Sequence, residues 1–241
     1  MDFPKFDSLV TSQRLYMRRA DLFLNDEYEG TTPAGDIDYW NRQAAAAKTA
    51  EDRAAIESQR EQLAEYAETF RRHYFVSCWN MAESENVAMW ERYTTGPESV
   101  AVVGTYLSLG SQLNPDVMHY GMVRYIDYDT TPLPSLNMLQ RISHKRHFFA
   151  DEREVRAVMC AIAPDEIRQQ HIDPHVTSDG CGWIPPVNVQ SLIKQVALHP
   201  KASPDFARKV ADLCAKHSLP APLPSKMSGT NAEVCQLGRR T

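Results

Sequence analysis

The sequence predicts a single α+β domain with a mixed or antiparallel sheet flanked by helices. Three observations point to this class. Short runs rich in valine and aromatic residues, such as 74–79 and 99–106, have the composition of strands. Between residues 36 and 73, Ala, Glu, Gln and Arg dominate, which predicts a long helical insertion. The chain of 241 residues, 43% apolar and 24% charged, has the size and composition of one globular domain.

In the first third of the chain, Phe6, Leu9 and Val10 have the spacing of one helix face, and 15–18 has the composition of a strand. The segment 25–33 is rich in turn formers and carboxylates, which favours an acidic loop. For 36–73 the helical spacing of apolar residues is compatible with one long helix or with two medium ones, and its charges are typical of a solvated helix face.

The rest of the chain continues the alternation of strand and helix patterns. We expect strands at 74–79, 99–106, 120–128, 154–162 and 195–199, and helices that follow 83–86 and cover 107–113, 136–149, 189–194 and 205–217. Ser203, ahead of Pro204, is the expected N-cap of the last helix. We expect the domain to cover 1–218, with a flexible tail at 219–241.

Composition and charge limit the cellular locations and the binding partners that we expect for the protein. No apolar stretch is long enough to span a membrane, the first residues lack a signal-peptide pattern, and five widely spaced cysteines suggest neither a disulfide framework nor a zinc knuckle. We therefore expect a cytoplasmic protein. A net charge of -5 does not favour nucleic acid as a partner, although 144–147 (His-Lys-Arg-His) could form a basic patch. A small nucleotide remains compatible with this charge.

A first polar-aromatic segment covers 78–93 and lies where a strand is expected to lead into a helix. The first amides of a helix attract anions and aromatic faces can stack on a base, so this junction is a candidate binding site. The alternative is that Met89 and Trp90 belong to the core and that Ser84 only caps the helix. The candidate binding residues of this segment are Trp79, Asn80, Glu83, Ser84 and Tyr93.

A second segment, 144–156, contains closely spaced charges. On a strand, Glu152, Glu154 and Arg156 lie on one face. Such a row can act as an acid/base pair or accept hydrogen bonds from a ribose, and the arginine would lower the pKa of one carboxylate. We take both glutamates as candidate catalytic residues, and Lys145 and Arg156 as candidate binding residues. An ion-pair ladder on an exposed strand face is equally compatible with the pattern.

Arg18 and Arg19 form the third candidate group, because the planar guanidinium suits a pyrophosphate. The alternative for either is a surface ion pair with Asp21 or Asp26. The sequence has no glycine-rich phosphate loop and no zinc-binding helix, and Pro174 interrupts the spacing of His171 and His175, so we expect no metal site.

The order of these segments resembles a bacterial family known as domain of unknown function 2971. The resemblance covers most of 5–218. It rests on Leu15-Tyr16 followed by Asn25-Asp26 and Glu29-Gly30, on Cys78-Trp79 with Glu83-Ser84 and the run 88–93, and on Lys145-Arg146 leading to 152–156. After Tyr93 the chain departs from the family pattern, since Ser99 stands where a glycine is expected. The family has no assigned reaction, so the resemblance implies a fold more than a function.

Three hypotheses follow for function. The leading one, an analogy of order, is an NAD-consuming enzyme similar in layout to ADP-ribosyltransferases, a transferase or NAD glycohydrolase active in bacterial stress or phage defence. In it Arg18 or Arg19 holds pyrophosphate, an aromatic residue stacks on nicotinamide, and Glu154 or Glu152 stabilises the ribosyl cation. The alternatives are a non-catalytic module that recognises a nucleotide or nucleic acid, and a metal-dependent nuclease whose carboxylates are Asp26, Glu29, Glu152 and Glu154.

Overall fold

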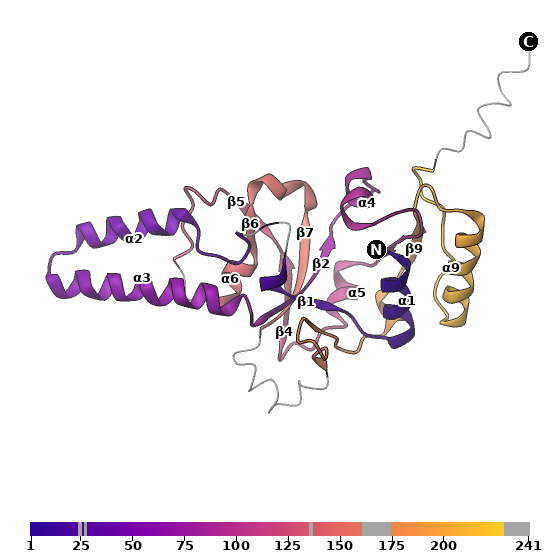
Figure 1. Cartoon of the computed structure of the whole chain (residues 1–241), viewed down its shortest axis with the longest axis horizontal. Coiled ribbons are helices and arrows are strands. Elements are labelled where there is room, and N and C mark those ends of the chain that lie inside the picture. Colours follow the sequence, from indigo (N-terminus) through magenta and orange to yellow (C-terminus); the bar gives the residue numbers. More distant parts are fainter. Residues whose placement is uncertain (24–25, 27, 135–136, 161–174, 229–241) are drawn as a thin grey trace, which may run out of the picture. The chain divides into compact units, whose positions relative to one another are not determined.

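The computed structural model describes residues 1–23, 26, 28–134, 137–160 and 175–228. The chain divides into two compact units, which are described separately: unit 1 contains Met1–Arg14, Ala82–Leu113 and Pro186–Thr241, and unit 2 contains Leu15–Met81 and Asn114–Pro185. Helices and a mainly antiparallel sheet confirm the predicted α+β class (Figure 1). The prediction of one domain over 1–218 stays a prediction.

A five-stranded sheet forms the centre of unit 2. Its order is β4 (Met118–Met122), β7 (Glu154–Cys160), β2 (Tyr74–Asn80), β1 (Met17–Arg19) and β8 (Gly182–Trp183), and every neighbouring pair is antiparallel. The β2–β7 ladder is the longest of these, running from the Tyr74–Cys160 pair to the Asn80–Glu154 pair. The sequence prediction of a strand at 154–162 is confirmed up to Cys160, and residues 161 and 162 lie outside the described residues.

Further short elements belong to unit 2. They are η1 (Ala20–Leu22), β5 (Arg124–Ile126), α6 (Met138–Ile142), β6 (His144–Arg146) and η2 (His147–Glu152), with β5 and β6 paired in parallel.

These elements correct two expectations. The expected strand 120–128 is divided at Val123, because the Val123 amide still bonds Glu154 on β7 whereas the next amide, that of Arg124, bonds Ser143 beside β6. The expected helix 136–149 is interrupted between α6 and η2, because 144–146 pair with β5; its first residue, 136, lies outside the described residues.

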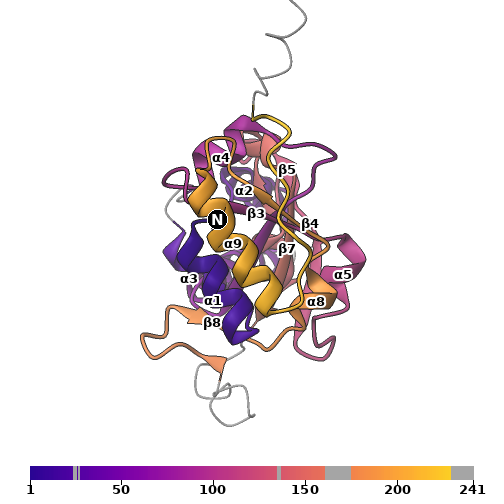
Figure 2. The same ribbon diagram turned by 90° about the vertical axis from the view of Figure 1, so that its right-hand side faces the viewer.

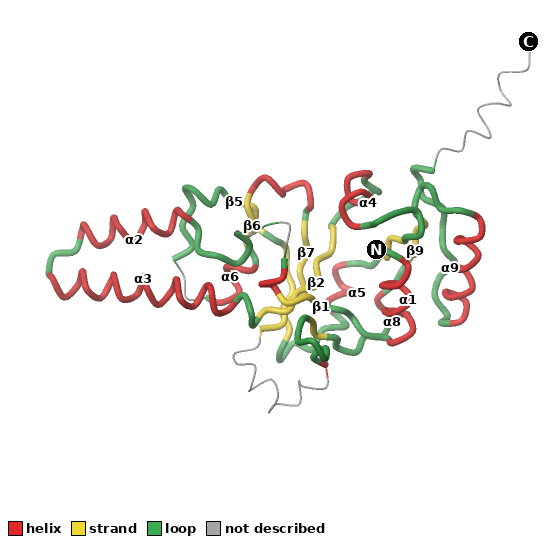
Figure 3. The backbone as a smooth tube through the Cα atoms, viewed as in Figure 1, coloured by secondary structure: helices red, strands yellow, loops and turns green. Residues whose placement is uncertain are grey.

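The helical insertion of unit 2 is a hairpin of two helices, α2 (Ala34–Ala46) and α3 (Ala50–Phe70) (Figure 3). Of the two predicted alternatives, the structure therefore has two helices. Thr49 caps α3 by accepting the Asp52 amide. At the base of the hairpin, Asp36 forms a buried ion pair with Arg141 of α6, in which Asp36 Oδ2 lies 3.0 Å from Arg141 Nη2. This ion pair fixes the start of α2.

One face of the sheet changes character along β2 and β7. Tyr74, Val76 and Val158 belong to a buried apolar cluster that Ala20 and Ile142 complete. Side chains two positions apart share a face, so Glu154 and Arg156 continue the same face beyond Val158. The apolar core of unit 2 therefore leads directly into buried charges.

Unit 1 contains a two-stranded sheet and short helices. Its elements are α1 (Phe3–Ser12), α4 (Val87–Tyr93), β3 (Val100–Val103), α5 (Tyr106–Gly110), α8 (Val189–Leu192), β9 (Gln195–Leu198) and α9 (Pro204–Lys216), with β3 and β9 antiparallel. α1 and α9 lie side by side (Figure 2), and the rings of Phe3 and Phe206 are 5.7 Å apart. Ser203 caps α9 as predicted. Asn86 rather than Ser84 caps α4.

The described part of the predicted tail is attached to unit 1. The Leu223 amide bonds Val196 of β9, and Ser225 is buried and donates to Glu85. Residues 229–241 lie outside the described residues. Among the helices of the described residues, none is both long and apolar enough to cross a bilayer.

Candidate functional site

Five buried charged side chains of unit 2 form one ionic cluster. Lys145 Nζ lies 2.6 Å from Glu152 Oε2, 2.6 Å from Glu154 Oε1 and 3.9 Å from Glu29 Oε2. Arg156 Nε donates to Glu154 Oε2 at 2.7 Å, and its terminal nitrogen pairs with Glu29. Each of the five side chains is at most 5% exposed. Both oxygens of Glu154 are therefore occupied within the cluster.

Four segments bring these charges together. Glu29 lies in a turn, where its amide donates to the Asp26 carbonyl. Lys145 comes from β6 and Glu152 from the end of η2, whereas Glu154 and Arg156 come from β7. The prediction that Glu152 lies on the strand is wrong, since Arg153 adopts a left-handed conformation with φ 41 and ends η2. The turn at Arg153 nevertheless directs both glutamates to Lys145. The ion-pair ladder that the sequence allowed is present, but it is buried rather than exposed.

Burial and neighbouring charges separate the pKa values of the two glutamates. Burial raises the pKa of Glu152 to about 7, with a hydrogen bond to Glu154 adding to the shift. Burial also acts to raise the pKa of Glu154, but Arg156, hydrogen bonds and Lys145 outweigh it and hold that pKa well below its usual range. Burial acts to lower the pKa of Lys145, and the surrounding carboxylates raise it instead. Glu154 is therefore a permanent anion, and Glu152 exchanges its proton near neutral pH.

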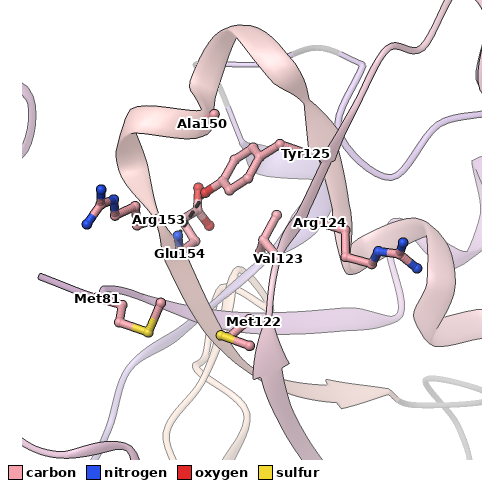
Figure 4. Close-up of a pocket in the computed structure, with 8 residues that line it drawn as sticks. All are labelled: Met81, Met122, Val123, Arg124, Tyr125, Ala150, Arg153 and Glu154. Atoms are coloured by element: carbon pink, nitrogen blue, oxygen red, sulfur yellow. Dashed lines mark hydrogen bonds between the residues drawn. The ribbon is translucent and has the colours of Figure 1, made fainter.

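A pocket of about 630 Å³ opens beside the cluster, within the range of small-molecule sites. The Tyr125 hydroxyl accepts the Glu154 amide at 2.8 Å, and Figure 4 shows the two side chains close together. The lining residues are Met81, Met122, Val123, Arg124, Tyr125, Ala150, Arg153 and Glu154. One end of the ionic cluster thus forms part of the pocket wall.

The rim of the pocket combines cations with apolar surface. Arg124 and Arg153 are exposed and stand on opposite sides of Tyr125 (Figure 4). Within the described part of the chain, neither guanidinium forms an ion pair. Met81 and Met122 are 47% and 60% exposed. An aromatic ring, two thioethers and two guanidinium groups suit a flat ligand that carries negative charge.

The structure brings the predicted residues of the second segment together. Glu152, Glu154, Lys145 and Arg156 all belong to the cluster. Asn80, predicted from the first segment, joins them by donating from Nδ2 to the backbone carbonyl of Glu152 at 2.6 Å. The expected basic patch at 144–147 is not a continuous exposed surface, since His144 and Lys145 are buried.

Trp79 and the two early arginines are placed elsewhere. Trp79 pairs with Val155 and so points to the opposite sheet face from Glu154. Arg18 bonds the carbonyl of Leu22 at 3.1 Å, and Arg19 pairs with Asp21 at 2.6 Å, the ion pair that the sequence allowed as an alternative. These three side chains do not line the pocket that contains Glu154.

The remaining predicted residues of the first segment belong to unit 1. Glu83 and Ser84 are exposed and precede α4, while Tyr93 ends it and is 42% exposed. The carboxylate of this segment with buried partners is Glu85, which accepts hydrogen bonds from Trp90 Nε1 at 3.3 Å and from the Ser225 hydroxyl. Glu85 therefore attaches the stretch around residue 225 to unit 1.

The carboxylates proposed for a metal ion already surround a cation. Lys145 Nζ lies among Glu29, Glu152 and Glu154, and Asp26 pairs with Arg146 at 2.8 Å. Among the described residues, no group of three or more His, Cys, Asp or Glu side chains could hold a metal. The donor set that the nuclease hypothesis needs is thus occupied by an ammonium group.

Sequence reasoning missed most of the pocket. Met81, Arg124, Tyr125 and Arg153 line it, and none was a candidate. One signal was present: the alternating pattern of 120–128 places Met122 and Arg124 on the same strand face. The left-handed turn at Arg153 carries no residue signature, because glycine and asparagine are the usual residues there.

The comparisons with known proteins found no matching family model, no matching curated protein and no matching solved structure. The resemblance to domain of unknown function 2971 therefore stays a prediction.

Proposed function

We propose that unit 2 is a recognition module that binds a small nucleotide in the pocket beside Glu154. One observation carries the proposal: the pocket wall combines the ring of Tyr125 and two exposed methionines with two exposed arginines, neither of which forms an ion pair with another described residue. A base can lie against the ring and the thioethers. Phosphate oxygens can accept hydrogen bonds from Arg124 and Arg153.

Binding without catalysis fits the state of Glu154. A carboxylate that stabilises a developing ribosyl cation must turn an oxygen toward the ligand. Glu154 instead directs one oxygen to Lys145 and the other to Arg156 at 2.6 and 2.7 Å. In this proposal the ionic cluster has a structural role and fixes the backbone of Tyr125, Arg153 and Glu154 around the ligand.

Equilibrium binding of NAD, ADP and adenosine by calorimetry tests the proposal. We expect ADP and NAD to bind and adenosine to bind at least tenfold more weakly, because a hydrogen bond to a charged group contributes about 1.5–3 kcal/mol. The variant Arg124→Gln/Arg153→Gln should lose the difference between ADP and adenosine. Arg42→Gln/Arg53→Gln, on the exposed hairpin, is the matched control and should bind as the wild type does. Equal affinity of the two variants for ADP would contradict the proposal.

The second candidate function is the NAD-consuming transferase or glycohydrolase. It is favoured by the separated pKa values of Glu152 and Glu154, because a pair of carboxyl groups with one proton near neutral pH is suited to acid/base chemistry. Release of nicotinamide from NAD by purified protein tests it. Turnover that disappears in Glu154→Gln, while NAD still binds, would favour this candidate over the recognition module.

We also propose the cytoplasm as the location, in a bacterial stress or phage-defence setting. Support comes from the cysteines of the described residues, Cys78, Cys160, Cys181 and Cys214, which are all free thiols, as is usual in a reducing compartment.

A further inference from the structure

The contact between Lys145 and Glu152 closes η2 on itself. Lys145 precedes η2 by two residues and Glu152 ends it, so the 2.6 Å hydrogen bond from Lys145 Nζ to Glu152 Oε2 joins the two ends of the segment. We call this pair the clasp. Glu152 is the buried residue of η2, whereas Phe148, the second residue of η2, is 73% exposed. The attachment of η2 to unit 2 therefore depends strongly on Glu152.

The charges around the clasp do not balance when all are ionised. Three carboxylates, Glu29, Glu152 and Glu154, face two cations, Lys145 and Arg156, which leaves one net negative charge in a buried site. The other groups near Glu152 do not supply the missing positive charge. They are Asp26 and Arg146, which pair with each other, the Tyr125 hydroxyl, the Cys78 thiol beside Glu154 and Arg156, and the Asn80 amide.

We propose that a proton on Glu152 keeps η2 closed beside the pocket, and that loss of this proton opens η2 and weakens ligand binding. With the proton present the cluster is neutral. Without it, an uncompensated buried charge favours any conformation that exposes Glu152 to water. Burial places the pKa of Glu152 at about 7, so the change falls in the physiological range.

Opening would alter the pocket directly. Ala150 of η2 and Arg153, which follows η2, both line it. Displacement of η2 therefore removes one wall and one of the two rim arginines. This regulation rests on the proposed function, since it concerns the same pocket, but the movement of η2 can be measured without any ligand.

Hydrogen exchange of residues 147–153 between pH 5 and 8 tests the proposal in the wild-type protein. After correction for intrinsic exchange, protection should fall about tenfold per pH unit between pH 5 and 7, where opening releases one proton, and should level off above pH 7, while the amides of α9 serve as the internal reference. In Glu152→Gln, which retains hydrogen bonding without a titrating charge, protection should not change with pH. Asp151→Asn, one residue earlier, should behave as the wild type does. Protection in the wild type that is constant from pH 5 to 8 would overturn the proposal.

Binding of NAD at the two ends of this range separates the inference from the proposed function. The charge of NAD is constant between pH 5 and 8, so any change in affinity comes from the protein. We expect the wild type to bind at least tenfold more weakly at pH 8 than at pH 5. Measurable binding with equal affinity at both pH values overturns the proposed regulation by pH, but not the proposed binding of a nucleotide in the pocket. No binding at either value, together with pH-dependent protection of η2, contradicts the proposed function and supports the clasp.

Discussion

Lys145 is the cation on which the stability of unit 2 depends most clearly. Its Nζ lies 2.6 Å from two carboxylates and 3.9 Å from a third, and the Lys145 side chain is 5% exposed. With Glu152 protonated the cluster is neutral, so Lys145→Met leaves one buried negative charge. Removal of one partner from a buried ion pair costs about 3–5 kcal/mol. For a chain of this length that corresponds to a fall in Tm of about 10 °C.

A second substitution checks whether charge is the cause. Lys145→Met/Glu154→Gln removes one charge of each sign. Its loss of unfolding free energy should therefore be about 2 kcal/mol smaller than the summed losses of Lys145→Met and Glu154→Gln. Thermal unfolding followed by circular dichroism at pH 7 measures all three variants. Lys48→Met, on the exposed turn between α2 and α3, is the control and should change Tm little. A Tm for Lys145→Met equal to that of the control would refute a stabilising role for the cluster.

Three further predictions follow from the same unit. Between pH 5 and 8 Glu152 binds more protons in the folded than in the unfolded state, so stability should fall by up to about 3 kcal/mol as pH rises through 7, and urea unfolding of Glu152→Gln should lack this decrease. Gly35→Ala should destabilise by about 2 kcal/mol in the same assay, because a Cβ atom would lie 2.7–2.8 Å from the backbone of Thr131. Arg153→Gly should raise stability by about 1 kcal/mol through relief of its positive φ while weakening NAD binding, whereas Gln13→Gly, also at positive φ, should leave NAD binding unchanged.

Much of the fold could be predicted from local patterns. The helix face of Phe6, Leu9 and Val10 and the cap at Ser203 depend on neighbours in sequence, and both are confirmed. The errors at 120–128 and 136–149 have a different cause. At Val123 the chain leaves one strand for another, and after Ile142 it pairs with β5, so long-range hydrogen bonds override the local pattern.

The candidate site was predictable in its charges but not in its geometry. A row of Glu152, Glu154, Arg156 with a nearby lysine indicates interacting groups, and these four do meet. Their depth could not be predicted, because burial depends on which segments cover the sheet. Arg18, Trp79 and Glu154, which the leading hypothesis places in one site, do not line one pocket. Trp79 points to the sheet face opposite Glu154, and Arg18 bonds the carbonyl of Leu22.

The most direct test of the proposed recognition role is a calorimetric titration of NAD at pH 6.5 combined with a nicotinamide assay on the same samples. Because both oxygens of Glu154 are paired with Lys145 and Arg156, we expect the wild type to bind NAD without releasing nicotinamide. Because Arg124 and Arg153 line the pocket, we expect Arg124→Gln/Arg153→Gln to bind NAD at least tenfold more weakly. Release of nicotinamide that depends on Glu154, or binding unaffected by loss of both arginines, would contradict it.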